Sequence, residues 1–134
     1  MRILVVDDDY VSRTKLKALL SAYGDCDIAP SGEIALELFT KAHEEGAPYQ
    51  LITLDIKMPG KGGKEVLTEV REWETANACY KSRTTAKIVM VTIMKDSENI
   101  MGSFRENCDG YLIKPITPEK LREYLAKLAI IRLE

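Results

Sequence analysis

The sequence predicts an α/β fold in which an open parallel sheet has helices on both faces. Two observations support this prediction. Short apolar runs rich in Val, Ile and Leu alternate along the chain with longer segments whose apolar residues recur at helical spacing. Most of these runs also end at a polar or charged residue, as expected where the carboxyl end of a strand opens onto a loop. Right-handed crossovers between the strands then leave few topologies.

The first half of the chain contains three of the expected strands and two of the expected helices. The strands are residues 3–6, 26–29 and 51–54. The first is a continuous apolar run, which is typical of a strand buried on both faces, and the third is another mainly apolar run that ends at an acid. A helix is expected from about Val11 to Tyr23, with Gly24 as the glycine that ends it. Ser31 is expected to cap a second helix, which Gly46 closes.

The second half adds two strands and three helices, giving five of each. The strands are residues 87–91 and 111–113. The apolar faces of the helices are formed by Val66, Leu67, Val70 and Trp73, then by Ile100, Met101 and Phe104, and finally by Leu121, Tyr124, Leu125 and Leu128. The stretch 77–86 is polar and longer than a typical connection, so it is either a contact loop or a surface decoration.

Composition limits the class of protein. The length of 134 residues predicts a single domain over residues 1–134. The 19 Lys and Arg against 21 Asp and Glu give a formal charge of −2, without a basic stripe for nucleic acid or an anionic membrane. No apolar run approaches the roughly 18 residues of a membrane span, and the four that follow Arg2 are too few for a signal peptide. Three widely spaced cysteines predict a reduced, cytoplasmic protein rather than a disulfide framework.

Polar residues at the strand ends form one group. Its members are Asp7 and Asp8 after the first strand, Asp55 after the third, Thr92 at the end of the fourth and Lys114 at the end of the fifth. Because the carboxyl ends of parallel strands meet at one edge of a sheet, we expect these side chains to converge on one pocket. Each residue alone has an ordinary explanation as a helix cap or a solvated charge. Carboxylates packed together repel, however, and Mg²⁺ would supply the compensating charge.

This group of residues indicates phosphoryl chemistry. A carboxylate beside Mg²⁺ can act as a nucleophile toward a phosphoryl group and form an aspartyl phosphate. Asp55 suits that role because it stands alone on its strand and precedes a Gly- and Pro-rich loop. Lys114 would neutralise charge on the transferring oxygens, and the Thr92 hydroxyl would donate a hydrogen bond to one of them. Asp7 and Asp8 suit metal binding, directly or through water.

Five stretches of the chain match one known family. They are Ile3-Leu4-Val5-Val6-Asp7-Asp8, Gly32 with Ala35-Leu36, Leu54-Asp55-Ile56-Lys57-Met58-Pro59-Gly60, Val91-Thr92 and Tyr111-Leu112-Ile113-Lys114-Pro115. Each is weakly specific alone, but their order and spacing together are highly specific. From Arg2 to about Leu128 the chain resembles the receiver domain of two-component response regulators. The resemblance implies a flavodoxin-like doubly wound sheet of order 2-1-3-4-5 with five helices.

The resemblance also implies roles for the acidic residues. Asp55 would be phosphorylated by a sensor histidine kinase or a histidine phosphotransfer protein. Mg²⁺ would be bound by the side chains of Asp8 and Asp55 and by the backbone carbonyl of Lys57, with Asp7 acting through water. The chain would then be a phosphoacceptor and not a turnover enzyme, at most phosphorylating itself from small donors and dephosphorylating itself.

Further roles follow from the same resemblance. Thr92 and Lys114 would contact the phosphoryl group, and the Lys114–Pro115 peptide bond is a candidate for the cis form. Thr92 and Tyr111 would form a switch pair, in which the hydroxyl moves toward the phosphate and the aromatic ring turns inward. The surface formed by the fourth helix, fifth strand and fifth helix would then bind an unidentified downstream protein, and it is also a candidate homodimer surface. We expect no direct contact with nucleic acid or a membrane.

Three residues near the site depart from the family pattern or tune its rates. Ile93 is large where the family usually has a small residue, so we expect it to cover part of the approach to Asp55 and to slow phosphoryl entry or loss. Lys57 and Met94 lie at the positions where family members tune hydrolysis. Because neither offers a carboxylate or an amide to orient a water molecule, we expect a long-lived phosphoryl group.

Two other classes of protein are weighed against this interpretation. A Mg²⁺-dependent phosphohydrolase of the haloacid-dehalogenase type also uses an Asp at a strand end, but it places a second acid where this chain has Lys57. A flavodoxin-like small-molecule binder would need a phosphate-binding loop after the first strand, where residues 7–9 are all Asp and would repel phosphate. The chain ends soon after the last expected helix, so we expect no effector domain of its own.

Overall fold

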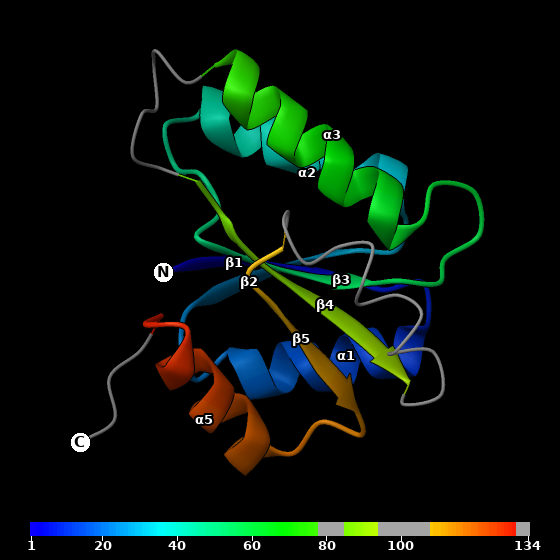
Figure 1. Ribbon diagram of the computed structural model, residues 1–134, viewed down its shortest axis with the longest axis vertical. Helices are drawn as coiled ribbons and strands as arrows, with labels where there is room; N and C mark the ends of the chain where they lie inside the picture. Colours follow the sequence, from blue (N-terminus) through cyan, green and yellow to red (C-terminus); the bar gives the residue numbers. More distant parts are fainter. Residues whose placement is uncertain (78–84, 94–107, 131–134) are drawn as a thin grey trace.

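The computed structural model describes residues 1–77, 85–93 and 108–130. All five strands are parallel and form one sheet in the order β2-β1-β3-β4-β5, which confirms the expected topology. The strands are β1 (Arg2–Val6), β2 (Asp25–Ala29), β3 (Leu51–Asp55), β4 (Lys87–Ile93) and β5 (Gly110–Lys114). The helices are α1 (Tyr10–Leu20), α2 (Gly32–Glu44), α3 (Gly63–Ala76) and α5 (Pro118–Lys127). Figure 1 shows α1 and α5 on one face of the sheet and α2 and α3 on the other.

The helix count differs from the sequence prediction. Four helices lie in the described residues, where the sequence predicts five in the whole chain. The expected helix around Ile100, Met101 and Phe104 falls outside the described residues, as do Met94 and most of the polar stretch 77–86. Of the expected signalling surface, the structure therefore describes the β5 and α5 parts.

Side-chain caps explain where three of the helices begin. The bonds are Ser12 N–H to Asp9 Oδ2 at 2.9 Å, Ile34 N–H to Ser31 Oγ at 3.2 Å and Lys120 N–H to Thr117 Oγ1 at 3.2 Å. Each bond satisfies a backbone donor that the first helical turn leaves without an intrahelical partner. Ser31 is thus the cap that the sequence predicts.

The end of α1 is a correction to the sequence prediction. The helix ends at Leu20, and Gly24 lies beyond it, where the chain turns into β2. A β-carbon on Gly24 would overlap the carbonyl oxygen of Met1, so the glycine allows two backbones to approach closely rather than ending a helix. Gly46, in contrast, follows the C-cap residue Glu45 of α2 and has a φ of 75°, as expected for a glycine that closes a helix.

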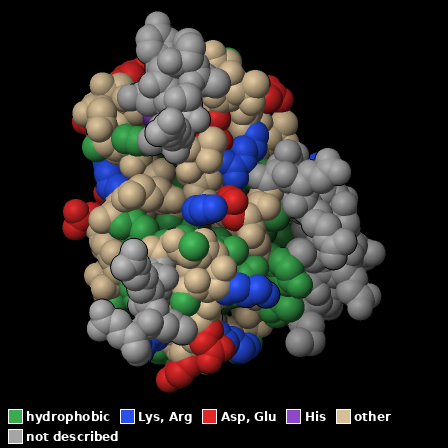
Figure 2. Space-filling view, turned by 60° about the vertical axis from the view of Figure 1, so that its left-hand side comes forward, with side chains coloured by type: hydrophobic (Ala, Val, Ile, Leu, Met, Phe, Trp, Pro, Cys, Tyr) green, Lys and Arg blue, Asp and Glu red, His purple; other side chains and the backbone are tan. Residues whose placement is uncertain are grey.

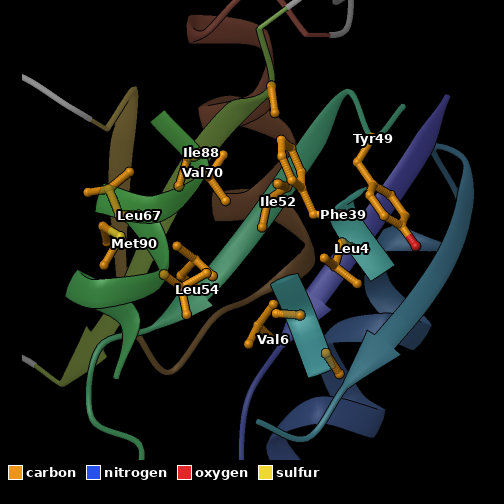
Figure 3. Close-up of a cluster of buried hydrophobic side chains, with 14 of the residues drawn as sticks. Leu4, Val6, Phe39, Tyr49, Ile52, Leu54, Leu67, Val70, Ile88 and Met90 are labelled. Carbon is orange, nitrogen blue, oxygen red and sulfur yellow. The ribbon is translucent and has the colours of Figure 1, made fainter. Parts of the chain in front are cut away.

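The larger core, called the α2/α3-side core, lies between the sheet and helices α2 and α3. Figure 3 shows its labelled side chains meeting between the strands and the two helices. They are Leu4, Val6, Phe39, Tyr49, Ile52, Leu54, Leu67, Val70, Ile88 and Met90, all 2% exposed or less. Trp73 packs at the border of this core, with its ring centroid 5.3 Å from Phe39 and 4.3 Å from His43. The sequence prediction that Trp73 lies in or next to the core is confirmed.

The opposite face of the sheet packs against α1 and α5. This α1/α5-side core contains Ile3, Val5, Leu16, Leu20, Leu51, Val89, Val91, Leu112, Leu121 and Leu125. Strands β1, β3 and β4 contribute to both cores, because successive side chains point to opposite faces of a sheet. The continuous apolar runs in the sequence therefore correspond to strands covered on both sides.

An ion-pair network joins α3 to the amino ends of β4 and β5. Arg71 donates from Nη1 to Oε1 of Glu74 at 2.7 Å and from Nη2 to Oδ2 of Asp109 at 2.9 Å. The other oxygen of Glu74 accepts the N–H of Ala86 at 2.8 Å, and Asp109 accepts the N–H of Ile88 at 2.8 Å. The network thus satisfies backbone donors where β4 begins.

A second network lies at the amino ends of β1 and β2. Arg2 contacts Asp27 at 3.1 Å, and its guanidinium carbon lies 4.8 Å from the centre of the Tyr49 ring. The Tyr49 hydroxyl donates to Asp27 at 2.7 Å. Burial, followed by this bond to the carboxylate, raises the pKa of Tyr49, so its hydroxyl stays protonated near neutral pH.

The described surface is polar and mixed in charge. On the face seen in Figure 2, acidic and basic side chains are interspersed, and no basic stripe crosses its described residues. Within residues 1–77, 85–93 and 108–130, no helix is both long enough and apolar enough to cross a membrane. Cys26 and Cys108 are free thiols, and Cys79 lies outside the described residues.

Candidate functional site

The strands bring the expected site residues to one edge of the sheet. Asp7 directly follows β1, and Asp55 is the last residue of its neighbour β3. Thr92 is the penultimate residue of β4, and Lys114 is the last residue of β5. Because all the strands run in the same direction, these positions lie at the carboxyl edge of the sheet. The polar edge that the sequence predicts is therefore present.

Three carboxylates form a cluster at this edge. One oxygen from each of Asp7, Asp8 and Asp55 lies within 4.8 Å of the others. The three side chains differ in burial, since Asp7 is 2% exposed, Asp55 is half-buried and Asp8 is exposed. The cluster therefore has a buried inner side and an outer side open to solvent.

The cluster changes the acidity of Asp55. Burial, followed by the negative charge of Asp7, raises the pKa of Asp55 from 3.8 to about 7. Lys114 acts in the opposite direction, and hydrogen bonds with Asp7 and Asp8 raise the pKa further. The cluster thus has more negative charge than its surroundings neutralise.

Lys114 places a positive charge at this edge. Its Nζ lies 3.2 Å from Oδ2 of Asp7. The other oxygen of Asp7 accepts the N–H of Asp9 at 2.9 Å. The buried carboxylate is therefore paired and hydrogen-bonded, as a buried charge needs to be. The Lys114–Pro115 peptide bond that follows is cis.

Arg13 is a residue of this edge that the sequence analysis missed. It lies on α1 and donates from Nη1 to the backbone carbonyl of Asp7 at 2.9 Å. Its guanidinium carbon also lies 5.6 Å from the centre of the Tyr10 ring. Arg13 thus anchors the loop that holds Asp7 and Asp8. The sequence signal that could have identified Arg13 was its position near the start of the helix that Asp9 caps, close to Asp7 and Asp8.

The expected switch and tuning residues have different surroundings. Thr92 is 4% exposed, and its hydroxyl donates to the carbonyl of Ile93 at 3.2 Å. Ile93 is 41% exposed at the end of β4, opposite Lys114 in the β4–β5 register. Tyr111 is half-buried on β5 and packs against the α2/α3-side core. Met94 lies outside the described residues.

The loop after Asp55 is held by close backbone contacts. The N–H of Ile56 donates to the carbonyl of Val91 at 3.2 Å, and the N–H of Gly63 donates to the carbonyl of Ile56 at 3.1 Å. A β-carbon on Gly63 would lie 2.5 Å from the carbonyl oxygen of Asp55. Lys57 is exposed in this loop, beside Asp55. Because Gly63 has no side chain, the backbone of Asp55 can lie close to it.

This arrangement fits a hard divalent cation. Three carboxylates with oxygens within 4.8 Å supply ligands that Mg²⁺ prefers, and their partial exposure leaves room for the waters it keeps. Burial, followed by the charge of Asp7, raises the pKa of Asp55, and such a cation would compensate that charge. Lys114 adds a fixed positive group for an anionic ligand beside the carboxylates.

Comparison with known proteins agrees with this geometry. The sequence matches the response regulator receiver domain over residues 3–126. It is 32% identical over 130 residues to the nitrate/nitrite response regulator protein NarL of Escherichia coli (strain K12), covering 95% of this chain and 54% of NarL. It is 29% identical over 127 residues to the chemotaxis protein CheY homolog of Campylobacter jejuni, covering 93% of this chain and 89% of that protein. The chain thus spans about half the length of NarL and most of the CheY homolog.

A solved structure extends the comparison to three dimensions. The response regulator protein TrrA of Thermotoga maritima, solved in complex with Mg(2+)-BeF, is 34% identical with a TM-score of 0.71. The similarity covers 95% of this chain and 97% of that structure. The family match includes β1 from Ile3 onward, the other four strands and the carboxyl edge described above. This chain belongs to the response regulator receiver domain family of two-component signalling.

Proposed function

We propose that residues 1–134 act as a single receiver domain that accepts a phosphoryl group on Asp55 and signals through a partner protein. The observation that supports this most directly is the position of Asp55, half-buried beside two carboxylates and the Lys114–Asp7 ion pair. Members of this family generally signal rather than catalyse a turnover reaction. Asp55 is therefore an acceptor that is consumed and regenerated.

The phosphoryl transfer is a displacement at phosphorus. A carboxylate oxygen of Asp55 attacks the phosphorus of a phosphohistidine on a histidine kinase or phosphotransfer protein. The new O–P bond forms as the N–P bond breaks, and the imidazole leaves with the electron pair of that bond. Asp55 suits this reaction because it ends β3 at the open edge of the sheet.

Mg²⁺ would be held by the side chains of Asp8 and Asp55 and by the carbonyl of Lys57, with Asp7 acting through water. When bound, it supplies positive charge that favours ionised Asp55 and neutralises the phosphoryl oxygens. Arg13 holds the carbonyl of Asp7 and thereby fixes the loop of the two N-terminal carboxylates.

Two side chains of neighbouring strands complete the site. Lys114 is paired with Asp7 and would turn part of its charge toward a phosphoryl oxygen. The hydroxyl of Thr92, bonded here to a backbone carbonyl, would donate to the phosphoryl group instead. Tyr111 on β5 would then turn into the space beside Thr92. This movement changes the β5 and α5 surface that binds the downstream partner or a second copy of the chain.

The proposal is tested by incubating the protein with acetyl phosphate and Mg²⁺ and measuring its intact mass. We expect the wild type to gain one phosphoryl group and Asp55→Asn to gain none. Removing Mg²⁺ with a chelator should abolish the gain. A wild type that is never modified under these conditions contradicts the proposal.

A second carboxylate provides the matched control. Asp9 is exposed, follows Asp8 directly and caps α1 through Ser12. Asn is an equally good helix cap, so Asp9→Asn changes a neighbouring charge while keeping the local structure. We expect Asp9→Asn to be phosphorylated like the wild type. Loss of phosphorylation in both variants would show that acidity of the loop, and not Asp55 itself, is required.

A further inference from the structure

We propose that Tyr124 is a positioning residue whose hydroxyl ties α5 to the β5 backbone at Tyr111, so that α5 follows the phosphorylation state of the domain. This inference rests on the proposed function, in which Tyr111 moves when Asp55 is phosphorylated. The inference adds a specific contact through which the movement of Tyr111 would reach α5.

The link is a hydrogen bond at the edge of the sheet. β5 pairs with β4 on one side and is the last strand of the sheet. Backbone groups of β5 that point away from β4 therefore have no strand to pair with. The N–H of Tyr111 finds a partner on α5 instead, because it donates to the Tyr124 hydroxyl at 2.7 Å.

Gly110 makes space for this bond. A β-carbon on Gly110 would overlap the Tyr124 hydroxyl and lie 2.8 Å from Cε1 and 2.9 Å from Cζ of the same ring. The phenol thus rests directly against the β5 backbone, where another residue would push it away. Gly110 and Tyr124 are therefore a complementary pair.

Nearby apolar contacts cannot replace the bond. Leu121 and Leu125 on α5 are each 1% exposed and pack in the α1/α5-side core together with Leu112 of β5. Such contacts are non-directional and tolerate small shifts between the helix and the strand. The hydrogen bond from Tyr111 to Tyr124 is directional, and it fixes α5 to the β5 residue that is expected to switch.

The bond also lies beside a surface that a partner could contact. Tyr111 and Tyr124 line a groove of about 390 Å³ together with Lys120, Glu123 and Lys127. Burial raises the pKa of Tyr124, which keeps the hydroxyl neutral beside these charged groups. Figure 1 shows α5 running alongside β5, so a shift of the strand at Tyr111 would move the charged side chains at the groove.

The test compares the wild type with Tyr124→Phe, which removes one oxygen atom and keeps the ring. Amide hydrogen exchange is measured on the full chain, with and without acetyl phosphate and Mg²⁺. In the unphosphorylated protein, we expect the Tyr111 amide to exchange about tenfold faster in Tyr124→Phe. On phosphorylation, we expect the change in exchange over residues 118–127 to be present in the wild type and lost in the variant. The extent of phosphorylation should be the same in both.

Tyr49→Phe is the matched control, because it removes another tyrosine hydroxyl bond of 2.7 Å at the opposite end of the sheet. We expect it to keep the α5 response. Gly110→Ala is a second route to the same result, since the added carbon displaces the phenol, and it should lose the response as Tyr124→Phe does.

The outcomes separate the inference from the proposed function. If the wild type is phosphorylated and α5 responds equally in Tyr124→Phe, or does not respond in either protein, the link through Tyr124 is overturned. If the wild type takes no phosphoryl group at all, the proposed function fails and the inference fails with it.

Discussion

Lys114 lies 3.2 Å from Asp7, although their strands, β5 and β1, are separated in the sheet by β3 and β4. The lysine side chain must therefore span the ends of the two central strands, where Thr92 and Asp55 lie. The side chain of Asp7 is only 3% exposed, so its charge needs this partner. Asp55 lies beside this pair, and Lys114 opposes the rise in the pKa of Asp55 that burial and the charge of Asp7 cause.

The first prediction concerns stability against pH in the absence of metal. The pKa of Asp55 is about 7 in the folded protein, against 3.8 as its ordinary value. A group with a raised pKa contributes stability that is present at low pH and is lost as pH rises through the folded value. We therefore expect Asp55→Asn to unfold at higher urea concentration than the wild type at pH 8, by about 1–2 kcal/mol after discounting for partial exposure. The difference should be smaller at pH 5.

Mg²⁺ supplies the control for this measurement. An ion that binds only the folded state stabilises it, so adding Mg²⁺ at pH 8 should raise the stability of the wild type. Asp55→Asn lacks one carboxylate of the cluster and should gain less. Equal stability of the two proteins at pH 8 without metal would contradict the role assigned to Asp55 in the charge imbalance.

The second prediction concerns Gly63, whose missing side chain leaves space for the backbone of Asp55. In Gly63→Ala the new carbon would lie 2.5 Å from the Asp55 carbonyl oxygen and 3.0 Å from Cα of Ile56. The backbone must shift, and misplacing a reacting group by about 1 Å can cost about 100-fold in rate. We expect phosphorylation by acetyl phosphate to slow by about 10- to 100-fold.

Gly62→Ala is the neighbouring control for this substitution. Gly62 has an extended backbone, and the nearest atom to an added carbon is the Ile56 oxygen at 3.3 Å. We expect this variant to be phosphorylated at close to the wild-type rate. Equal rates in both alanine variants would mean that the position of Asp55 does not depend on Gly63.

The third prediction concerns Ile93. It is 41% exposed at the end of β4, next to Thr92 and opposite Lys114, where a large side chain can narrow the approach to Asp55. We expect Ile93→Ala to speed both the gain of a phosphoryl group and its loss. Ile34→Ala, at a similarly exposed position on α2, should change neither rate. Unchanged rates in Ile93→Ala, measured by intact mass over time, would refute the covering role.

The fourth prediction concerns the network around Arg71. The side chain of Glu74 is 6% exposed, so replacing Arg71 by Met leaves a buried carboxylate without its cation. Breaking a buried pair in this way costs about 3–5 kcal/mol, and the loss should appear as a lower free energy of unfolding in urea. Lys61→Met breaks a pair with Glu69 whose carboxylate is 44% exposed, and it should cost less than about 1 kcal/mol. Similar losses in both variants would show that the network adds nothing beyond a surface ion pair.

The central strands could be predicted from their apolar runs, whereas the order of the strands was implied by the family resemblance. Residues 3–6 and 51–54 can be buried only between two layers of helices, and this already indicates a parallel sheet. The end of α1 could not be predicted in the same way. A glycine at position 24 is the residue type that commonly ends a helix. Its role here depends instead on Met1, which the fold brings next to it.

The residues of the candidate site and of the α5 link also differ in whether they could be predicted from the sequence. Asp7, Asp55 and Lys114 could be predicted to converge, because strand ends in a parallel sheet share an edge. Arg13 and Tyr124 could not, since each acts on a backbone group whose position depends on the packing of a helix against the sheet. Contacts between a helix side chain and a strand backbone leave no periodic pattern in the sequence.

The last prediction concerns Thr53, in the middle of β3. It is 1% exposed, and among the described residues its hydroxyl has no hydrogen-bond partner. A buried polar group without a partner is destabilising, whereas an apolar group of the same shape is not. We expect Thr53→Val to raise the free energy of unfolding by about 1 kcal/mol. Thr40→Val makes the same change where the hydroxyl bonds to Leu36 and Glu37, and it should give no such gain. Urea denaturation measures the free energy of unfolding of both variants. A loss of stability in Thr53→Val would show that the Thr53 hydroxyl has a hydrogen-bond partner.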